Sequence, residues 1–564
     1  MAEGVAHRRG SAPTVPTGDR PRSSGALAAL EPSRGNHAPG TGPGPSNPAA
    51  GNLEPGNLEP GNVEPVNVEP VNAGAGGAGL SNSALHGLPA AVAVPRYDRD
   101  GLVPAIVHIG VGGFHRAHQQ VYFDELCRRT GTPGWGVIGV GLHRPLMGQV
   151  LRAQDGLYTV VVRSAEGDEV RVVGSLVDYL FAPDDPEAVL GVLADERTRI
   201  VTLTITDTAY PDGEVDVGLD EVRADVEHPE APGTAFGYLV EALARRRGAG
   251  LPPLTVLSCD NVPHNGGATR AAVVSTARLR DPELADWIDQ RVSFPSCMVD
   301  RITPETTPEL REEVAARLGV RDAWPVVTEP FSQWIIEDDF CNGRPPLELA
   351  GAQFVEDVAP YSLLKTRLLN GVHSALGHLA RLSGFGTAPE ALADPVLRDY
   401  AVGYLHEVAA LLQAPPGVDL AAYCDATIER LSNHRLADRI PRLCRRGSTK
   451  IPAYVLPSLR SALRRDAPRA HLVLATAAWM RALRGTDHRG RPFELDDADG
   501  LRLQPVARAA GTDPRPLLDR RDVFGSLGDD PRAVRELRGA LEALDRDPLA
   551  AAVLARSGAR GWAA

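Results

Sequence analysis

The sequence predicts an α/β protein: a doubly wound, mostly parallel sheet, followed by a mainly α-helical C-terminal part and preceded by a disordered tail. Three observations predict this. After the tail, short β-branched runs alternate with helix-like segments. Amphipathic stretches replace those runs after about residue 360, and the first 95 residues contain no aromatic side chain. The chain has 564 residues, 43% of them hydrophobic, which is enough apolar material for more than one core.

Residues 1–95 are expected to form a disordered, low-complexity tail. Inside it a five-residue repeat, GNLEP-GNLEP-GNVEP-VNVEP, runs from Gly51 to Pro70. A proline at every fifth position prevents a regular helix or sheet. A stretch without aromatic residues also buries too little apolar surface to offset the entropy of ordering it. A solvated extension is therefore expected, with a docking segment as the alternative.

Residues 96–358 carry the pattern of an α/β domain. The runs that predict strands are Ile106–Val111, Trp135–Val140, Tyr158–Val162, Ile200–Ile205 and Leu254–Leu257. Helix-like segments, such as Gln119–Arg129 and Thr234–Arg247, lie between several of them. Strands that alternate with helices favour a parallel sheet covered on both faces.

Residues 359–564 are expected to be mainly helical. Amphipathic stretches with apolar residues at helical spacing are Val396–Leu412, Leu420–Leu431, Leu456–Arg464 and Ala533–Leu544.

Charge and composition argue against several classes of partner. The net charge of −13 argues against nucleic acid, because binding to a phosphate backbone requires concentrated positive charge. No apolar run approaches the roughly 18 residues of a membrane span, and the N-terminus lacks the apolar core of a secretory signal. A cytoplasmic protein without a membrane partner is expected. The six cysteines are far apart without a CxxC pair, so reduced thiols are expected, and no tight His/Cys/Glu cluster indicates a metal.

A glycine-rich turn follows the first predicted strand, and a helix pattern begins near Ala117. Glycines at such a junction let the backbone approach a pyrophosphate at the N-terminus of the next helix. The segment predicted to hold this cofactor is Ile109, Gly110, Val111, Gly112, Gly113, Phe114, His115 and Arg116. The third glycine of the usual GxGxxG spacing falls at His115, so the fingerprint is incomplete. A purely geometric role for the glycines is the alternative.

The second predicted strand lacks the acid that often holds the ribose hydroxyls of NAD. Its last residue is followed by Gly141-Leu142-His143-Arg144, and the next acid is Asp155. His143 and Arg144 either face the 2′-phosphate of NADP or simply face solvent. NAD is the first expectation, and NADP remains open.

Lysine is scarce in this chain. Only two of its 59 lysine and arginine residues are lysines, Lys365 and Lys450. Arginine keeps its proton at working pH, whereas a desolvated lysine can act as a base. At about 100° per residue, Lys365, Asn370 and His373 fall within an arc of about 140° on one predicted helix. Such groups can converge on one small ligand, and a surface-facing helix end is the alternative.

Two asparagines, Asn261 and Asn265, follow another predicted strand. Ligands bind at the carboxyl ends of parallel strands in open sheets. Amide donors from Asn261 and Asn370 are suited to stabilise an alkoxide as it forms. An ordinary turn is the alternative, because DN and NG are common turn pairs.

Six motifs together resemble the mannitol dehydrogenase family, the polyol-specific long-chain dehydrogenases. They are GVGGFHRAHQ at Gly110, LSCDNVPHNG at Leu257, FPSCMVDRITP at Phe294, TEPFSQWIIED at Thr328, KTRLLNGVH at Lys365 and RLCRRGSTK at Arg442. The resemblance runs from about Ile106 to the C-terminus. It implies a Rossmann-type dinucleotide-binding domain in residues 96–358, a helical substrate-binding domain in residues 359–564, and an active site between them.

By this resemblance, Lys365 corresponds to the general base, and Asn261 and Asn370 to the pair that stabilises the alkoxide. The residues that correspond to ligands of the polyol hydroxyls are His373, Asp300, Arg442 and Lys450.

The resemblance implies a metal-independent oxidoreductase that uses NAD or NADP to interconvert a sugar alcohol and its ketose. Mannitol and fructose are the first expectation. Fructuronate reduction and arabinitol or sorbitol oxidation are alternatives within the family. Binding of a carboxylate substrate requires a further positively charged side chain, for which Arg445 and Arg446 are candidates. From another class, the alternative is a catalytically silent dinucleotide-binding sensor, although a sensor needs no base.

The chain departs from the family pattern at three places. Ser362 stands where a glutamate is common, one turn before the lysine. The segment Thr206–Tyr210 replaces the more usual TExGY, and the ribose acid is missing.

Overall fold

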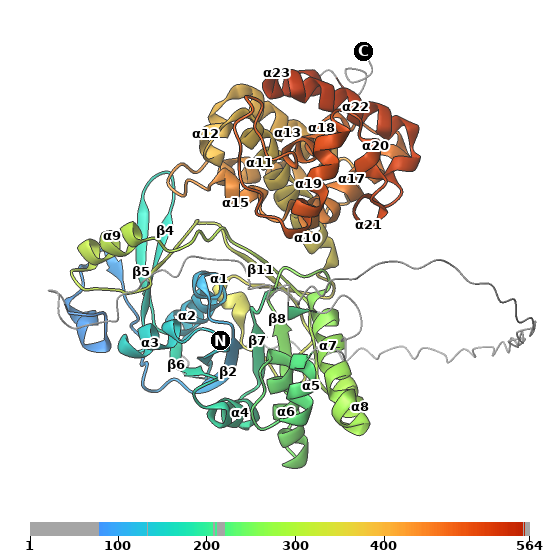
Figure 1. The fold of residues 1–564 in the computed structure, drawn as a ribbon. Helices are drawn as coiled ribbons and strands as arrows, with labels where there is room; N and C mark the ends of the chain where they lie inside the picture. The colour runs from blue at the N-terminus through green and yellow to red at the C-terminus, as the bar shows by residue number, and fades with distance from the viewer. Residues whose placement is uncertain (1–77, 132–133, 207–208, 211–219, 557, 559–564) are drawn as a thin grey trace, which may run out of the picture. The chain divides into compact units, whose positions relative to one another are not determined.

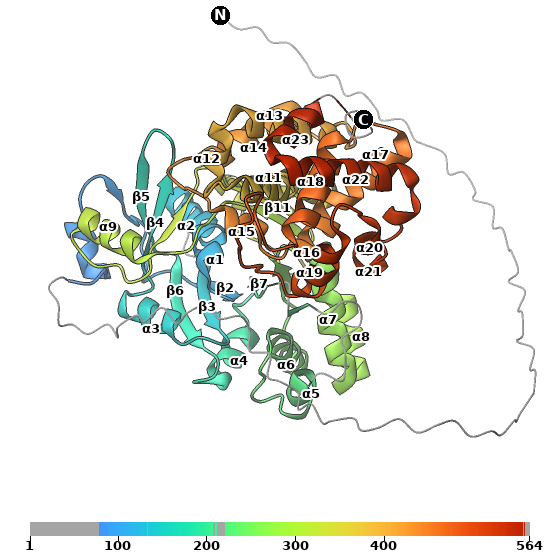
Figure 2. The same ribbon diagram turned by 45° about the horizontal axis from the view of Figure 1, so that its top comes forward.

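The computed structural model describes residues 78–131, 134–206, 209–210, 220–556 and 558. Within residues 96–358, runs of valine, isoleucine and leucine form a five-stranded parallel sheet (Figures 1 and 2). In spatial order its strands are β6 (Leu176–Phe181), β3 (Gly136–Gly141), β2 (Pro104–Ile109), β7 (Ile200–Leu203) and β8 (Thr255–Ser258). The first strand of this sheet is central and the chain crosses to both sides of it, which is the Rossmann arrangement. The predicted fold class is confirmed.

One predicted strand lies outside this sheet. The run Tyr158–Val162 forms β4 (Tyr158–Arg163), which pairs antiparallel with β5 (Asp168–Val173). Four residues connect these strands, and so short a connection permits only antiparallel pairing. The hairpin belongs to a second sheet with β1 (Val92–Ala93) and β10 (Val326–Thr328). A third sheet contains β9 (Cys297–Asp300), β11 (Gln333–Glu337) and β12 (Gln353–Val355).

The α-helices of residues 96–358 alternate with these strands, and all but one of them bury apolar side chains. They are α1 (Gly113–Ala117), α2 (Gln119–Thr130), α3 (Leu146–Ala153), α4 (Pro186–Ala194), α5 (Asp220–Glu227), α6 (Ala235–Gly248), α7 (Asn265–Arg280), α8 (Pro282–Arg291) and α9 (Pro308–Leu318). One core lies where β2 and β7 meet α4 and α6, with Val107, Val201 and Leu239 fully buried. The alternation of strands and helices therefore places the ends of β2, β7 and β8 at one edge of the sheet.

The folded chain begins before residue 96. Residues 78–95 contain a 3₁₀ turn, η1 (Asn82–Gly87), and strand β1. Leu80 is fully buried against Leu157, Val161 and Leu310, and its amide donates to the carbonyl of Arg321 at 2.9 Å. Composition alone could not show this, because residues 78–95 are mostly small or polar and contain only three leucines and two valines.

Replacing Leu80 is therefore expected to destabilise the protein. Leu80→Ala should lower the free energy of unfolding by about 2–5 kcal/mol, the usual cost of emptying a buried leucine site. The measurement is urea denaturation followed by circular dichroism. Leu349→Ala is the control, because Leu349 is 49% exposed and its loss should change stability by less than about 0.5 kcal/mol. Equal midpoints for the two variants would show that residues 78–95 contribute nothing to the fold.

The described residues after residue 358 are mainly helical, as predicted (Figure 1). The α-helices are α10 (Ala359–Leu364), α11 (Gly371–Ser383), α12 (Ala388–Ala393), α13 (Pro395–Ala409), α14 (Leu420–Leu431), α15 (Ile440–Cys444), α16 (Gly447–Lys450), α17 (Leu456–Arg465), α18 (Ala470–Ala482), α19 (Ala498–Ala510), α20 (Arg515–Leu518), α21 (Arg521–Phe524), α22 (Pro531–Arg546) and α23 (Pro548–Arg556). Their core includes Leu376 of α11, Leu474 of α18 and Leu537 of α22, all fully buried. Two π-helical turns, η4 (Lys365–Asn370) and η5 (Ile451–Val455), interrupt this pattern.

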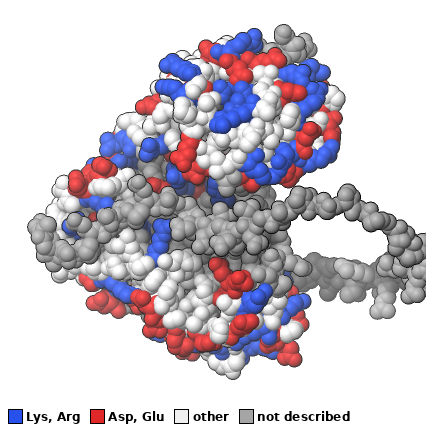
Figure 3. Space-filling model, in the orientation of Figure 1, with Lys and Arg blue, Asp and Glu red and all other residues white. Residues whose placement is uncertain are grey.

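On the face drawn in Figure 3, acidic and basic side chains of the described residues lie interspersed. Within the described part of the chain, no helix has both the length and the apolar composition of a membrane span.

Candidate active site

The glycine turn after β2 requires glycine for steric reasons. Gly110 has a φ of +99°, and a Cβ atom there would lie 2.2 Å from the carbonyl oxygen of Thr204. The Gly110 carbonyl accepts hydrogen bonds from the Thr204 hydroxyl at 2.6 Å and the Gly112 amide at 2.7 Å. Helix α1 then begins at Gly113. The chain is thus held in a tight turn between the ends of β2 and β7.

The backbone on the open side of the turn is accessible. A Cβ atom on Gly113 would meet no atom within 4 Å, and one on Gly112 would meet only the Gly110 carbonyl, at 3.9 Å. Backbone amides of a first helical turn have no acceptor within the helix, so they can donate to a phosphate.

The predicted cofactor segment divides into open and buried residues. Gly110, Gly112, Gly113 and Phe114 are at least partly exposed, whereas Ile109, Val111, His115 and Arg116 are buried. The His115 ring stacks on His108 with 3.3 Å between centroids, and its Nε2 bonds Gln120 at 2.9 Å. The Arg116 guanidinium donates to the Trp324 carbonyl. The side chains of His115 and Arg116 therefore pack into the protein beneath the turn. Only the backbone of these two residues is placed to contact a cofactor.

Lys365 and Asn261 meet although 104 residues separate them. The ammonium group of Lys365 donates to Oδ1 of Asn261 at 2.6 Å. Asn261 lies after β8, at the carboxyl edge of the parallel sheet, and Lys365 begins η4 of the helical part. Lys365 is only 8% exposed, and this burial lowers the pKa of its ammonium group. The arrangement joins a lysine with a lowered pKa to the side-chain amide of an exposed asparagine.

Both lysines adjoin π-helical turns. Lys365 opens η4, which ends at Asn370, and Lys450 directly precedes η5. The expected 100° spacing does not apply between Lys365 and Asn370, because π-helical hydrogen bonds join residues five apart. Such turns are frequent at functional sites. His373 follows in regular helix α11.

His373 lies among cations. Burial lowers the pKa of its imidazole well below the usual value, and the positive charges of Arg442, Arg430 and Lys450 lower it further. Its Nε2 is buried without a hydrogen-bond partner among the described residues. Burial, assisted by the charge of Arg442, lowers the pKa of Lys450 to about 8. A neutral imidazole with a free nitrogen is suited to hold a hydroxyl group.

Asp300 has a partner that the sequence analysis missed. Both of its carboxylate oxygens accept hydrogen bonds from Arg430 of α14, each at 2.9 Å. Arg430 also donates to both oxygens of Glu329, at 2.7 and 2.9 Å. An arginine among so many carries no sequence signal of its own, although Glu329 stands in the quoted TEPFSQWIIED motif.

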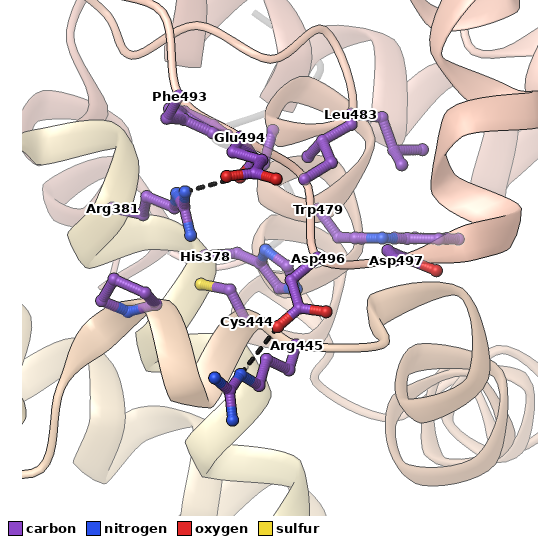
Figure 4. A pocket seen from close by; sticks show the side chains of 13 residues that line it. His378, Arg381, Cys444, Arg445, Trp479, Leu483, Phe493, Glu494, Asp496 and Asp497 are labelled. Atoms are coloured by element: carbon purple, nitrogen blue, oxygen red, sulfur yellow. Dashed lines mark hydrogen bonds and ion pairs between the residues drawn. The ribbon is translucent and has the colours of Figure 1, made fainter. Parts of the chain in front are cut away.

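A small cavity is lined by residues of α11, α15 and α18 and by the segment before α19 (Figure 4). Its volume of about 20 Å³ has room for about one water molecule. His378 and Trp479 line it, and their ring nitrogens have no partner among the described residues. At its rim the guanidinium of Arg445 pairs with Asp496 at 2.7 Å and with Glu305 at 3.3 Å. Arg445, a candidate for holding a substrate carboxylate, thus pairs with two acids, and all three side chains are largely exposed.

Two departures from the family pattern have different outcomes. Asp207 and Thr208 lie outside the described residues. Tyr210 is buried, and its hydroxyl bonds Ser258 at 2.7 Å and Asp260 at 2.8 Å. After β3, His143 and Arg144 are exposed, so the structure leaves them free to face either solvent or a ligand.

A Rossmann sheet with an open glycine turn, together with a buried lysine of a helical domain held at the end of β8, is typical of a dinucleotide-dependent oxidoreductase. Residues 104–349 match the mannitol dehydrogenase Rossmann domain, and residues 357–545 match the mannitol dehydrogenase C-terminal domain. The chain therefore belongs to the mannitol dehydrogenase family.

Individual proteins that are similar to this chain are polyol dehydrogenases by name. A mannitol 2-dehydrogenase of Aspergillus terreus is 45% identical over 447 residues, covering 77% of this chain and 89% of the relative. The mannitol 2-dehydrogenase of Aspergillus oryzae is 44% identical over 463 residues, covering 79% of this chain and 92% of the relative. The solved structure of Pseudomonas fluorescens mannitol 2-dehydrogenase, a ternary complex with NAD and D-mannitol, superposes with a TM-score of 0.76 at 37% identity, covering 84% and 98%. The solved structure of a D-sorbitol dehydrogenase in substrate-free form has a TM-score of 0.77 at 37% identity, and the match covers 84% of this chain and 100% of that chain.

Proposed function

We propose that this protein is an NAD-dependent polyol dehydrogenase that interconverts D-mannitol and D-fructose. The observation that carries the proposal is the contact between the buried Lys365 and Asn261, beside His373 with its unpartnered Nε2. A nicotinamide cofactor, when bound, takes or supplies the hydride. The open turn at Gly112 and Gly113 holds its pyrophosphate.

The chain's own residues handle the proton. Neutral Lys365 removes the proton from the reacting hydroxyl, which a lysine can do near neutral pH only when its pKa is lowered. The amide groups of Asn261 and Asn370 donate to the oxygen as negative charge develops on it. His373, Arg442 and Lys450 hold further hydroxyls of the polyol. Among the described residues, no three His, Cys, Asp or Glu side chains form a group that could hold a metal ion.

A neutral sugar fits the charges better than a uronate. Arg445 is paired with Asp496 and Glu305, and Arg442 donates to both carboxylate oxygens of Asp438. A substrate carboxylate would therefore have to compete with the carboxylates that already pair with these two arginines. The 44–45% identical relatives named mannitol 2-dehydrogenase favour mannitol over the other polyols.

The test is a matrix of substrates and cofactors. D-Mannitol, D-sorbitol and D-arabinitol are oxidised with NAD or NADP, and D-fructose and D-fructuronate are reduced with NADH or NADPH. D-Mannitol with NAD should give the highest kcat/KM among the oxidations, by at least about tenfold. Fructuronate reduction that exceeds fructose reduction would contradict the proposal. If NADP is used well, Arg144→Asp should shift the preference toward NAD, because Arg144 would then hold the 2′-phosphate.

A further inference from the structure

Arg430 links helix α14 to two carboxylates of the α/β part of the chain. It extends from α14 to Asp300, at the end of β9, and to Glu329, directly after β10. The side chains of Arg430, Asp300 and Glu329 are 8%, 4% and 1% exposed. Phe331 lies against the guanidinium, with 3.9 Å between its ring centroid and Cζ. Two parallel pairs of hydrogen bonds, one to each carboxylate, fix the guanidinium plane.

The charges around Lys365 pose a chemical problem. The charged groups near it are Asp300 at the end of β9 and Arg430 of α14. The other titratable groups near it are Cys297 of β9, His118 directly before α2 and His373 of α11. A buried carboxylate is the natural partner of a buried ammonium group. An ion pair between Asp300 and Lys365 would hold the proton on the lysine. Lys365 instead donates to the neutral Asn261, while both oxygens of Asp300 are engaged by Arg430.

We propose that Arg430 is a positioning residue: by holding both oxygens of Asp300, it prevents this carboxylate from pairing with Lys365. The lysine then keeps Asn261 as its partner and can release its proton to solvent or take one from the substrate. Burial and the positive charge of Arg430 both favour the neutral amine, and the charge of Asp300 opposes them. This inference rests on the proposed function, in which Lys365 is the base.

The experiment measures kcat/KM for polyol oxidation against pH. In Arg430→Gln, Asp300 is free to pair with Lys365, so the rising limb of the profile should move to higher pH by about 1–3 units. At neutral pH the rate should fall by about tenfold or more and should recover in alkali. Adding Asp300→Asn to Arg430→Gln should bring the limb back toward the wild-type position, although KM for the polyol rises.

Arg469→Gln is the matched control. Arg469 also forms a buried bidentate pair, with Glu536 at 2.7 and 2.9 Å, but it does not act on Lys365. Its loss should lower stability and leave the pH profile in place. Should Arg430→Gln fail to fold, Asp300→Asn alone still tests the idea, because removing the opposing anion should move the limb to lower pH.

A rate that falls equally at all pH values in Arg430→Gln would overturn the inference and leave Arg430 a structural residue. So would an unmoved limb in Asp300→Asn. Failure of the proposed function looks different: Lys365→Ala would then oxidise the polyol at nearly the wild-type rate, whatever the Arg430 variants do.

Discussion

Lys365→Ala is expected to reduce polyol oxidation by about 10²–10⁴-fold, the usual value of general-base assistance. The structure gives the physical reason. The amine is buried, its pKa is lowered, and its nearest hydrogen-bond partner is the neutral oxygen of Asn261. The measurement is kcat with saturating polyol and cofactor. Cofactor affinity should change little, because the glycine turn lies elsewhere in the site.

Lys365→Arg distinguishes a lysine that accepts a proton from one that only supplies a positive charge. Guanidinium keeps the positive charge but cannot accept a proton at working pH, so the loss should nearly equal that of the alanine variant. Lys450→Arg is the matched control, since it makes the same change at the other lysine of the chain. It should raise KM for the polyol more than it lowers kcat. If Lys365→Arg retained most of the wild-type rate, Lys365 would be only a positive charge near the substrate.

The two directions of the wild-type reaction should have opposite pH profiles. Oxidation needs neutral Lys365, so its rate should rise as pH passes through the lowered pKa of this group. Ketose reduction needs the ammonium form as a proton donor, and its rate should fall over the same range. Lys365→Ala should flatten both profiles.

The sequence predicted those parts of the fold that depend on local periodicity. The stretch Leu420–Leu431 is a helix with the predicted bounds, and four of the five predicted strands lie in the parallel sheet. The exception, Tyr158–Val162, has the same composition as the others, because β-branched residues suit either kind of sheet. Only the four-residue connection to β5 distinguishes it. β6 was missed because Asp178 and Tyr179 interrupt its apolar run.

The sequence predicted site residues of a type that is rare in this chain. It did not predict residues whose role depends on ion pairs with distant parts of the chain. Lysine scarcity and the motifs pointed to Lys365, which the structure places against Asn261. Arg430 was invisible, because its importance comes from contacts with Asp300 and Glu329, 130 and 101 residues away. His115 stands in the predicted cofactor segment, and the structure turns its ring inward onto His108. Side-chain direction in the first turn of a short helix is set by packing, which the sequence alone does not reveal.

Asn261→Ala is expected to lower kcat for polyol oxidation by about 10²–10³-fold, the typical cost of removing one donor to a developing oxyanion. The substitution removes two things together: the amide that stabilises the alkoxide and the oxygen that orients Lys365. Folding should be almost unaffected, because Asn261 is exposed. The measurements are kcat, KM and the thermal unfolding midpoint of the same preparation.

Asn265 of the same motif provides the control. Its amide donates to the carbonyls of Asp260 and Cys297 and accepts from the Cys297 amide, all within the buried core. Asn265→Ala should therefore lower the unfolding midpoint and leave kcat of the folded enzyme within about an order of magnitude, since the cost is that of buried hydrogen bonds. If Asn261→Ala behaved like Asn265→Ala, the asparagine would be a structural residue of the loop.

Asn261→Asp tests the electrostatic part of the same assignment. The change replaces the neutral partner of Lys365 with a carboxylate at nearly the same position, 2.6 Å from the ammonium group in the present geometry. An opposite charge this close favours the ammonium form and should raise the pKa of Lys365 by about 1–3 units. The new negative charge also repels the alkoxide. Oxidation at neutral pH should consequently fall further than in Asn261→Ala, with a rising limb displaced to higher pH. A profile that stayed at the wild-type position would show that Lys365 does not carry the proton in the rate-limiting step.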